Sequence, residues 1–177
     1  MFTRNAADLF IAIALGVAAS AACAQGPRLG QPIKPAELAA WDLHVLPDGT
    51  GLPPGSGTPA QGAKVYADKC SACHGENGKG GISAALVGGE PIRNMSSVKR
   101  IANFWPYSTT LFDFTRRAMP WNAPRTLTNE EVYAVTAYIL SLNKLIGEND
   151  VMNAETLPKV QMPNRDGFIV RFPERTP

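Results

Sequence analysis

The sequence predicts an all-α fold with Pro/Gly-rich N- and C-terminal extensions. Three segments carry apolar residues at the spacing of a buried helix face, at about 59–70, 108–117 and 128–142. Alternation typical of a strand is confined to the stretch GFIVRF, Gly167 to Phe172. A length of 177 residues gives room for one ordinary domain plus a leader and tails. We therefore expect one helical domain over residues 59–145.

The N-terminus predicts an export signal, which we place at residues 1–24. Arg4 precedes an apolar core, and Ala-Cys-Ala before Gln25 has the small-x-small form of a cleavage site. An uncleaved spanning helix is the rival interpretation, but the apolar run from Leu9 to Ala24 is shorter than the roughly 20 residues that a bilayer requires. We therefore expect a periplasmic protein with no stable membrane span once the leader, and Cys23 with it, is removed.

Prolines and glycines dominate both extensions. Residues 25–58 form an N-terminal arm whose densest block is LPDGTGLPPGSGTP, and a short helix is predicted in it from Pro35 to Trp41. Three apolar side chains of the arm are expected to fasten it to a domain surface: Trp41, Val45 and Leu46. Residues 146–177 form a tail with four prolines and no sustained period.

The first two helices have clear signals. Pro59 suits a first helical turn, and the helix that it begins is expected to run to Cys70. A glycine-rich loop, GENGKGGISAALVGG, follows. In the helix at about Ser108 to Arg117, one apolar face is predicted from Leu111, Phe114 and Ala118.

The last helix has the strongest signal. Thr128 as N-cap and Glu131 three residues later form a capping box. Its apolar stripe comprises Val132, Val135, Ile139 and Leu142.

The segment CSACH, Cys70 to His74, allows three chemistries: a zinc site, a redox disulfide or covalent haem attachment. A structural zinc needs four ligands, and beyond this motif the chain offers only His44 or a carboxylate. A thioredoxin-like disulfide needs a βαβ context, which the helical flanks do not provide. Two thiols one turn apart can each bond a porphyrin vinyl group, and the following imidazole can bind the iron. We therefore predict one covalently bound haem c, with thioethers at Cys70 and Cys73 and His74 as an axial ligand.

The sixth ligand decides between an electron carrier and a catalyst. A methionine opposite histidine closes the iron and suits electron transfer, whereas an open position suits oxygen or peroxide chemistry. We select Met119, which follows a helix and precedes Pro120. For Met95, Met152 and Met162 we expect apolar packing. His44 lies in the Pro/Gly-rich arm, where we expect it to be solvated or locally hydrogen-bonded.

Aromatic and basic residues gather before Met119. Trp105 or Tyr107 is expected to contact the haem and to donate a hydrogen bond to a propionate, because each has a polar tip that needs a partner when buried. The formal net charge of +2 gives no argument for nucleic acid, which needs a strongly basic face. Two interpretations stay open for five cations, a solvated face or a docking ring for a partner: Arg93, Lys99, Arg100, Arg116 and Arg117.

The segments CSACH, AMP at Met119 and AVTAYIL in the last helix resemble class I cytochromes c. The resemblance covers about residues 59–145 and implies a class I cytochrome c fold, with the Pro/Gly-rich extensions added to it. In that fold the first and last helices cross, and Gly62 and Tyr138 are expected at the crossing.

Three further segments are similar to the cytochrome subunits of sulfite and sulfane dehydrogenases: AAWDLHVLPDGTGLPPGSG, NFWPYSTTLFDFTRRAMPWNAP and MPNRDGF. The resemblance implies an electron-transfer subunit, with no sulfur chemistry of its own, that accepts electrons from a molybdenum-cofactor subunit and passes them to a downstream cytochrome c or oxidase. The single haem motif favours the monohaem, sulfite-dehydrogenase-like form. A freestanding carrier and a peroxidase-like or gas-binding haem protein are the alternatives.

One departure from the family pattern concerns His74. Many members have a proline before the leucine of the haem loop, and its carbonyl accepts the imidazole proton. Here Ala85 precedes Leu86, so the acceptor is not identified by the sequence.

Overall fold

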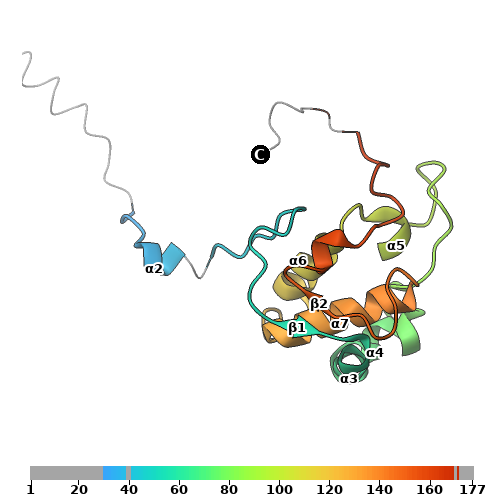
Figure 1. Cartoon of the computed structure of the whole chain (residues 1–177), viewed down its shortest axis with the longest axis horizontal. Coiled ribbons are helices and arrows are strands. Elements are labelled where there is room, and N and C mark those ends of the chain that lie inside the picture. The colour runs from blue at the N-terminus through green and yellow to red at the C-terminus, as the bar shows by residue number, and fades with distance from the viewer. Residues whose placement is uncertain (1–29, 39–40, 170, 172–177) are drawn as a thin grey trace, which may run out of the picture. The chain divides into compact units, whose positions relative to one another are not determined.

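The computed structural model describes residues 30–38, 41–169 and 171, and the chain divides after Trp41 into two units (Figure 1). The predicted signal peptide lies outside the described residues. In the first unit, α2 spans Pro35–Leu38, within the helix predicted from Pro35 to Trp41. Trp41 is exposed within this unit, and its packing on the helical domain stays a prediction.

The regular secondary structure of the second unit is mostly helical, with little strand, which confirms the all-α prediction. Its elements in chain order are β1 (Ser56–Gly57), α3 (Pro59–Lys69), α4 (Ser71–His74), the 3-10 turn η1 (Glu76–Gly78), α5 (Ile101–Phe104), α6 (Ser108–Ala118), α7 (Asn129–Leu142), β2 (Met152–Asn153) and the 3-10 turn η2 (Leu157–Lys159) (Figure 1).

Helix α7 is the centre of this unit and packs against α3, α6 and both strands. Eight of its residues are buried, so it is apolar on most of its circumference rather than along one stripe. The predicted capping box of Thr128 and Glu131 is confirmed at its start. Thr58 and Gln61 form a second capping box, at the start of α3.

Helices α3 and α7 cross at Gly62, as predicted. A Cβ on Gly62 would lie 1.9 Å from the carbonyl oxygen of Ala134 and 2.7 Å from the Cβ of Tyr138. Only a residue without a side chain allows the two backbones to approach so closely. The rings of Tyr66 and Tyr138 meet beside the crossing, with centroids 5.3 Å apart.

The buried face of α6 differs from the prediction. Leu111, Phe112 and Thr115 are buried, whereas Phe114 is 43% exposed. Phe112 packs on Tyr133 of α7 with ring centroids 4.5 Å apart. The helix therefore turns a face centred on Phe112, not on Phe114, toward the core.

The arm and the tail meet in a two-stranded antiparallel sheet in which Ser56 pairs with Asn153. The tail contributes four buried residues to the core: Met152, Leu157, Val160 and Met162. From the arm, Val45 packs partly against this core while Leu46 is exposed. The alternating stretch at Gly167 to Phe172 forms no strand in its described residues, 167–169 and 171.

Candidate functional site

The two cysteines and the histidine of CSACH lie where α3 ends and α4 begins. Cys70 ends α3, with its N–H donating to the carbonyl of Tyr66, and His74 is the last residue of α4. Both thiols are free, since neither forms a disulfide. Cys73 is exposed, whereas burial raises the pKa of the Cys70 thiol to about 11. The pair therefore presents two unbridged thiols one helical turn apart.

His74 is held in one orientation by the loop that follows it. Its Nδ1 donates a hydrogen bond to the carbonyl oxygen of Ala84 at 2.9 Å, because a carbonyl can only accept. The acceptor that the sequence left unidentified is thus Ala84 and not Ala85. With Nδ1 protonated, the lone pair of Nε2 is the one that can bind a metal.

The glycine-rich loop folds back tightly on the motif. Gly75 has a φ of 74°, and a Cβ there would lie 2.1 Å from the carbonyl oxygen of Gly80. The N–H of Gly80 donates to the carbonyl of His74 at 2.8 Å. From the other side, the buried Tyr66 donates its hydroxyl to the carbonyl of Gly75 at 2.9 Å. These contacts fix the backbone on both sides of His74.

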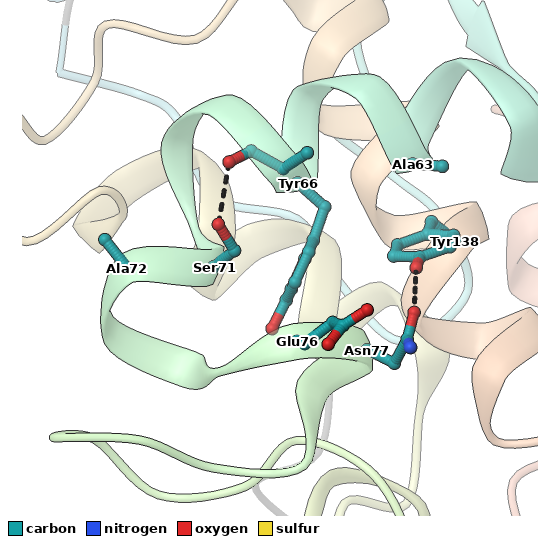
Figure 2. Close-up of a pocket in the computed structure, with 8 residues that line it drawn as sticks. Ala63, Tyr66, Ser71, Ala72, Glu76, Asn77 and Tyr138 are labelled. Carbon is teal, nitrogen blue, oxygen red and sulfur yellow. Dashed lines mark hydrogen bonds between the residues drawn. The ribbon is translucent and has the colours of Figure 1, made fainter.

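An open hollow of about 420 Å³ borders the motif (Figure 2). It is lined by Ala63, Tyr66, Ala67, Ser71, Ala72, Glu76, Asn77 and Tyr138. Tyr138 donates to the side-chain oxygen of Asn77 at 3.0 Å, and Ser71 donates to the carbonyl of Ala67 at 2.7 Å. Its lining holds a single carboxylate and no histidine or cysteine. It therefore offers neither a metal site nor a paired acid and base.

Met119 caps the C-terminus of α6 and is half-buried. Its N–H donates to the carbonyl of Thr115, and its extended backbone ends the helix before Pro120. The turn η1, which follows His74, and the helix α6, which precedes Met119, both contact α7. Helix α7 therefore supports both the turn that follows His74 and the helix that precedes Met119, the two predicted axial ligands.

The remaining methionines and His44 differ in their exposure to solvent. Met152 and Met162 are 4% and 3% exposed, which confirms that they pack in the core. Met95 is 88% exposed, so its predicted apolar packing is wrong. His44 is exposed, with Nδ1 3.7 Å from the carboxylate of Asp42, as expected of a solvated histidine.

Trp105 and Tyr107 flank Pro106 between α5 and α6. Trp105 is partly buried and packs on Phe114 with ring centroids 5.6 Å apart. The guanidinium of Arg165 lies 5.1 Å from the centre of the Tyr107 ring. Both residues therefore lie in the short segment between α5 and α6. That either residue contacts the haem or donates a hydrogen bond to a propionate stays a prediction.

Asn103 was missed by the sequence analysis, although it organises this region. It is 7% exposed, and its amide donates to the carbonyls of Glu90 and Val98 at 2.6 and 2.9 Å. Its oxygen accepts from the N–H of Arg100 at 2.6 Å. The only sequence signal is an asparagine at the third position of a short helix, where it can return to the N-cap.

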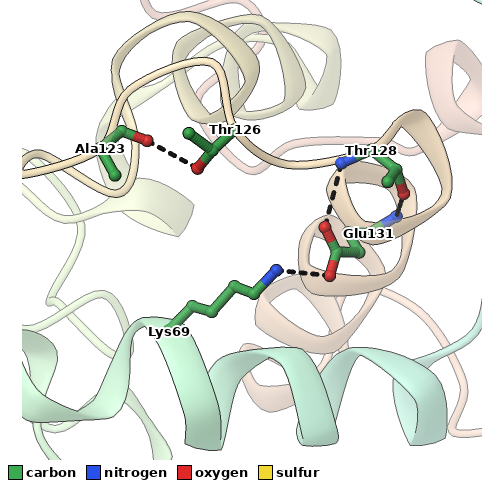
Figure 3. A network of polar contacts seen from close by, with 5 residues as sticks. All are labelled: Lys69, Ala123, Thr126, Thr128 and Glu131. Carbon is green, nitrogen blue, oxygen red and sulfur yellow. Dashed lines mark hydrogen bonds and ion pairs between the residues drawn. The ribbon is translucent and has the colours of Figure 1, made fainter.

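Lys69 and Glu131 join the end of α3 to the start of α7 (Figure 3). The Nζ of Lys69 lies 2.6 Å from Oε1 of Glu131, whose other oxygen accepts from the N–H of Thr128. The hydrogen bond from Lys69, with that from Thr128, lowers the pKa of Glu131. The ion pair therefore braces the helix that leads into Cys70.

Two of the cations considered for a docking ring have intramolecular contacts. Arg117 pairs with Asp113 on α6, with its Nε 3.0 Å from the carboxylate. Lys99 donates to the carbonyl of Met95 at 3.1 Å and lies over the ring of Phe104. A solvated face and a docking ring stay the two alternative interpretations of these cations.

The side chains at CSACH fit a covalently bound haem better than the other two chemistries. Two free thiols adjoin an imidazole whose Nδ1 is already committed to a carbonyl. Among residues 30–38, 41–169 and 171, no group of three or more His, Cys, Asp and Glu side chains could hold a metal ion, which argues against a structural zinc. Within the same ranges, no helix is long and apolar enough to cross a membrane.

Comparison with known proteins agrees with this fit. The sequence model of the family described as "Cytochrome c" matches residues 59–143. A chain in the crystal structure of the sulfane dehydrogenase SoxCD from Paracoccus pantotrophus is 38% identical, with a TM-score of 0.76. That match covers 85% of the present chain and 75% of the other, and the predicted class I cytochrome c fold is confirmed. The chain therefore belongs to the cytochrome c family, whose members carry electrons on a covalently bound haem c.

Proposed function

We propose that this chain is a periplasmic electron-transfer subunit with one haem c, which receives electrons from the molybdenum-cofactor subunit of a sulfane or sulfite dehydrogenase. The observation that carries the proposal is the environment of CSACH, where two free thiols adjoin a histidine oriented by the carbonyl of Ala84. When bound, the haem supplies a one-electron couple. The protein residues attach it, orient its ligands and limit the access of water.

Four residues hold the haem in this proposal. Cys70 and Cys73 form the thioethers, and Nε2 of His74 is the proximal ligand, because its Nδ1 is committed to Ala84. Met119 is the distal ligand, at the end of a helix that the buried Phe112 fixes in the core. The presence of a single C-x-x-C-H segment in the sequence supports a count of one haem.

A methionine in the sixth position closes the iron to exogenous ligands and favours electron transfer over catalysis. In this account the chain performs no sulfur chemistry. It accepts electrons one at a time and delivers them to a downstream cytochrome c or oxidase.

The choice of electron donor is supported by the similarity to a chain of the SoxCD sulfane dehydrogenase, which extends beyond the region that the cytochrome c model matches. Support also comes from two parts of the extensions that pack within the second unit: β1 of the arm pairs with β2 of the tail, and four tail residues are buried in the core. Sulfane and sulfite remain separate substrates to be tested. A freestanding carrier is distinguished from a subunit by its failure to co-purify with a molybdenum protein.

Rapid mixing tests the proposal. The oxidised holoprotein is mixed with sulfite or with a sulfane-sulfur compound, with and without the candidate molybdenum subunit, and reduction is followed by the haem absorption. We expect fast reduction only when the subunit is present, and slower reduction of Met119→Ala. Met95→Ala is the matched control, because Met95 is exposed and is expected to leave the rate unchanged. Reduction that proceeds equally without the molybdenum subunit would refute the proposed pairing.

A further inference from the structure

The C-terminal tail lies along the segment that joins α5 to α6. The hydroxyl of Ser108, at the start of α6, donates to the carbonyl of Leu157 at 2.6 Å in a buried position. The turn η2 packs against α6 (Figure 1). Farther along the tail, the ring of Phe168 meets that of Phe104 edge-on, with centroids 5.5 Å apart. The tail therefore contacts both ends of the segment 104–108.

Asn164 completes the end of α5. Phe104 is the last residue of that helix, and its carbonyl accepts a hydrogen bond from the side-chain amide of Asn164 at 2.7 Å. Carbonyls at a helix C-terminus have no partner within the helix. The proline at position 106 has no N–H and so cannot supply a backbone donor to this turn. A single side chain from the tail thus holds the backbone directly before Trp105.

Arg165 covers the other side of the segment. The guanidinium of Arg165 lies 5.1 Å from the centre of the Tyr107 ring. The backbone N–H of Arg165 donates to the carbonyl of Met162 at 3.1 Å. Met162 is 3% exposed and anchors this part of the tail in the core. The N–H of Gly167 donates to the carbonyl of Asn164, which closes the turn that presents these side chains.

We propose that Asn164, Arg165 and Phe168, which we call the tail clamp, are positioning residues. They would hold Trp105 and Tyr107 as contacts of the haem that CSACH binds, and so raise its reduction potential. The inference rests on the proposed haem site at CSACH and on the predicted haem contacts of Trp105 and Tyr107. Water near a haem favours the more highly charged ferric state, so a cover that excludes water favours reduction. Without the clamp, the segment 104–107 keeps the packing of Trp105 on Phe114 but loses the hydrogen bond to the carbonyl of Phe104 and the contacts to the Phe104 and Tyr107 rings.

The test uses the full-length holoprotein and three variants. Asn164→Leu removes the amide that binds Phe104, and Phe168→Ala removes a half-exposed ring without opening the core. Gln161→Leu is the matched control, because it changes an exposed side-chain amide in the same tail that donates to the carbonyl of Lys159 at 3.3 Å. Each protein is titrated for its reduction potential and examined for the methionine-to-iron absorption of the ferric state.

We expect Asn164→Leu to lower the equilibrium constant for reduction about tenfold, which corresponds to about 59 mV for a one-electron couple. Phe168→Ala is also expected to lower the equilibrium constant for reduction, and Gln161→Leu is expected to leave it unchanged. Wild-type potentials in both clamp variants, with or without a lower melting temperature, would overturn the inference and leave the clamp a structural brace. Because the potential is measured without any partner, this result is independent of whether a molybdenum subunit reduces the protein.

Discussion

Replacing Gly62 with alanine tests the helix crossing that supports the haem motif. The new Cβ would lie 1.9 Å from the carbonyl oxygen of Ala134 and 2.5 Å from its carbon. These are backbone atoms in the middle of α7, so they cannot rotate away as a side chain would. To reach an ordinary contact of 3.4 Å, α3 must move by about 1.5 Å from its partner.

The cost follows from two opposing effects. Overpacking against a rigid neighbour destabilises the fold by about 3 kcal/mol, and the helix propensity of alanine returns about 1 kcal/mol. We therefore expect Gly62→Ala to lower the free energy of unfolding by about 2 kcal/mol. At about 4 °C per kcal/mol for a domain of this size, the melting temperature falls by about 8 °C.

Thermal and urea unfolding of the holoprotein, followed by far-UV circular dichroism, measures this change. Gly147→Ala is the matched control, because a Cβ at Gly147 meets only Asp150, at 3.5 Å. That variant is expected to retain or slightly raise the stability, by about 0.5 kcal/mol. If Gly62→Ala unfolds at the wild-type temperature, the close approach of α3 and α7 is not what the crossing depends on, and the reasoning is refuted.

Two further predictions concern α7 and α6. Glu131→Gln keeps the capping oxygen but removes the ion pair with Lys69, so we expect a loss of about 1 kcal/mol at about pH 7. The pKa of Glu131 is lowered from 4.5, so this stabilisation is present above that value and is lost as the pH falls through the folded-state pKa. Urea titrations should show the two proteins converging once the pH is well below the folded-state pKa of Glu131, and a constant difference would contradict the assignment. Phe112→Ala should cost about 4 kcal/mol in urea unfolding, because Phe112 is fully buried. Phe114→Ala should cost less than half as much, and equal losses would show that the assigned buried face of α6 is wrong.

Local signals allowed α7 to be predicted well and α6 only in part. The capping box of Thr128 and Glu131 depends on residues three positions apart, so the sequence contains all of the relevant information. On α6, two alternative apolar faces are compatible with helical spacing, one with Phe112 and one with Phe114. The structure selects Phe112 because a long-range partner, Tyr133, covers it, and periodicity alone does not reveal that partner.

The parts that could not be predicted depend on pairings between distant segments. Strands β1 and β2 are two residues long, too short for an alternating pattern, and they come from opposite ends of the unit. The acceptor of His74 depends on how the glycine-rich loop folds, which placed Ala84 rather than Ala85 at the imidazole. The chemistry of CSACH, by contrast, follows from residue types and spacing, and it was predicted from the sequence.

The axial ligation of the haem is the central claim, and absorption spectroscopy of the ferric holoprotein tests it most directly. Wild type and Met95→Ala are expected to show the long-wavelength methionine-to-iron absorption and to resist cyanide. Met119→Ala is expected to lose that absorption and to bind cyanide readily, because its sixth position is open. Persistence of the absorption in Met119→Ala, or its absence from the wild type, would contradict the assignment of Met119 and with it the account of a closed electron carrier.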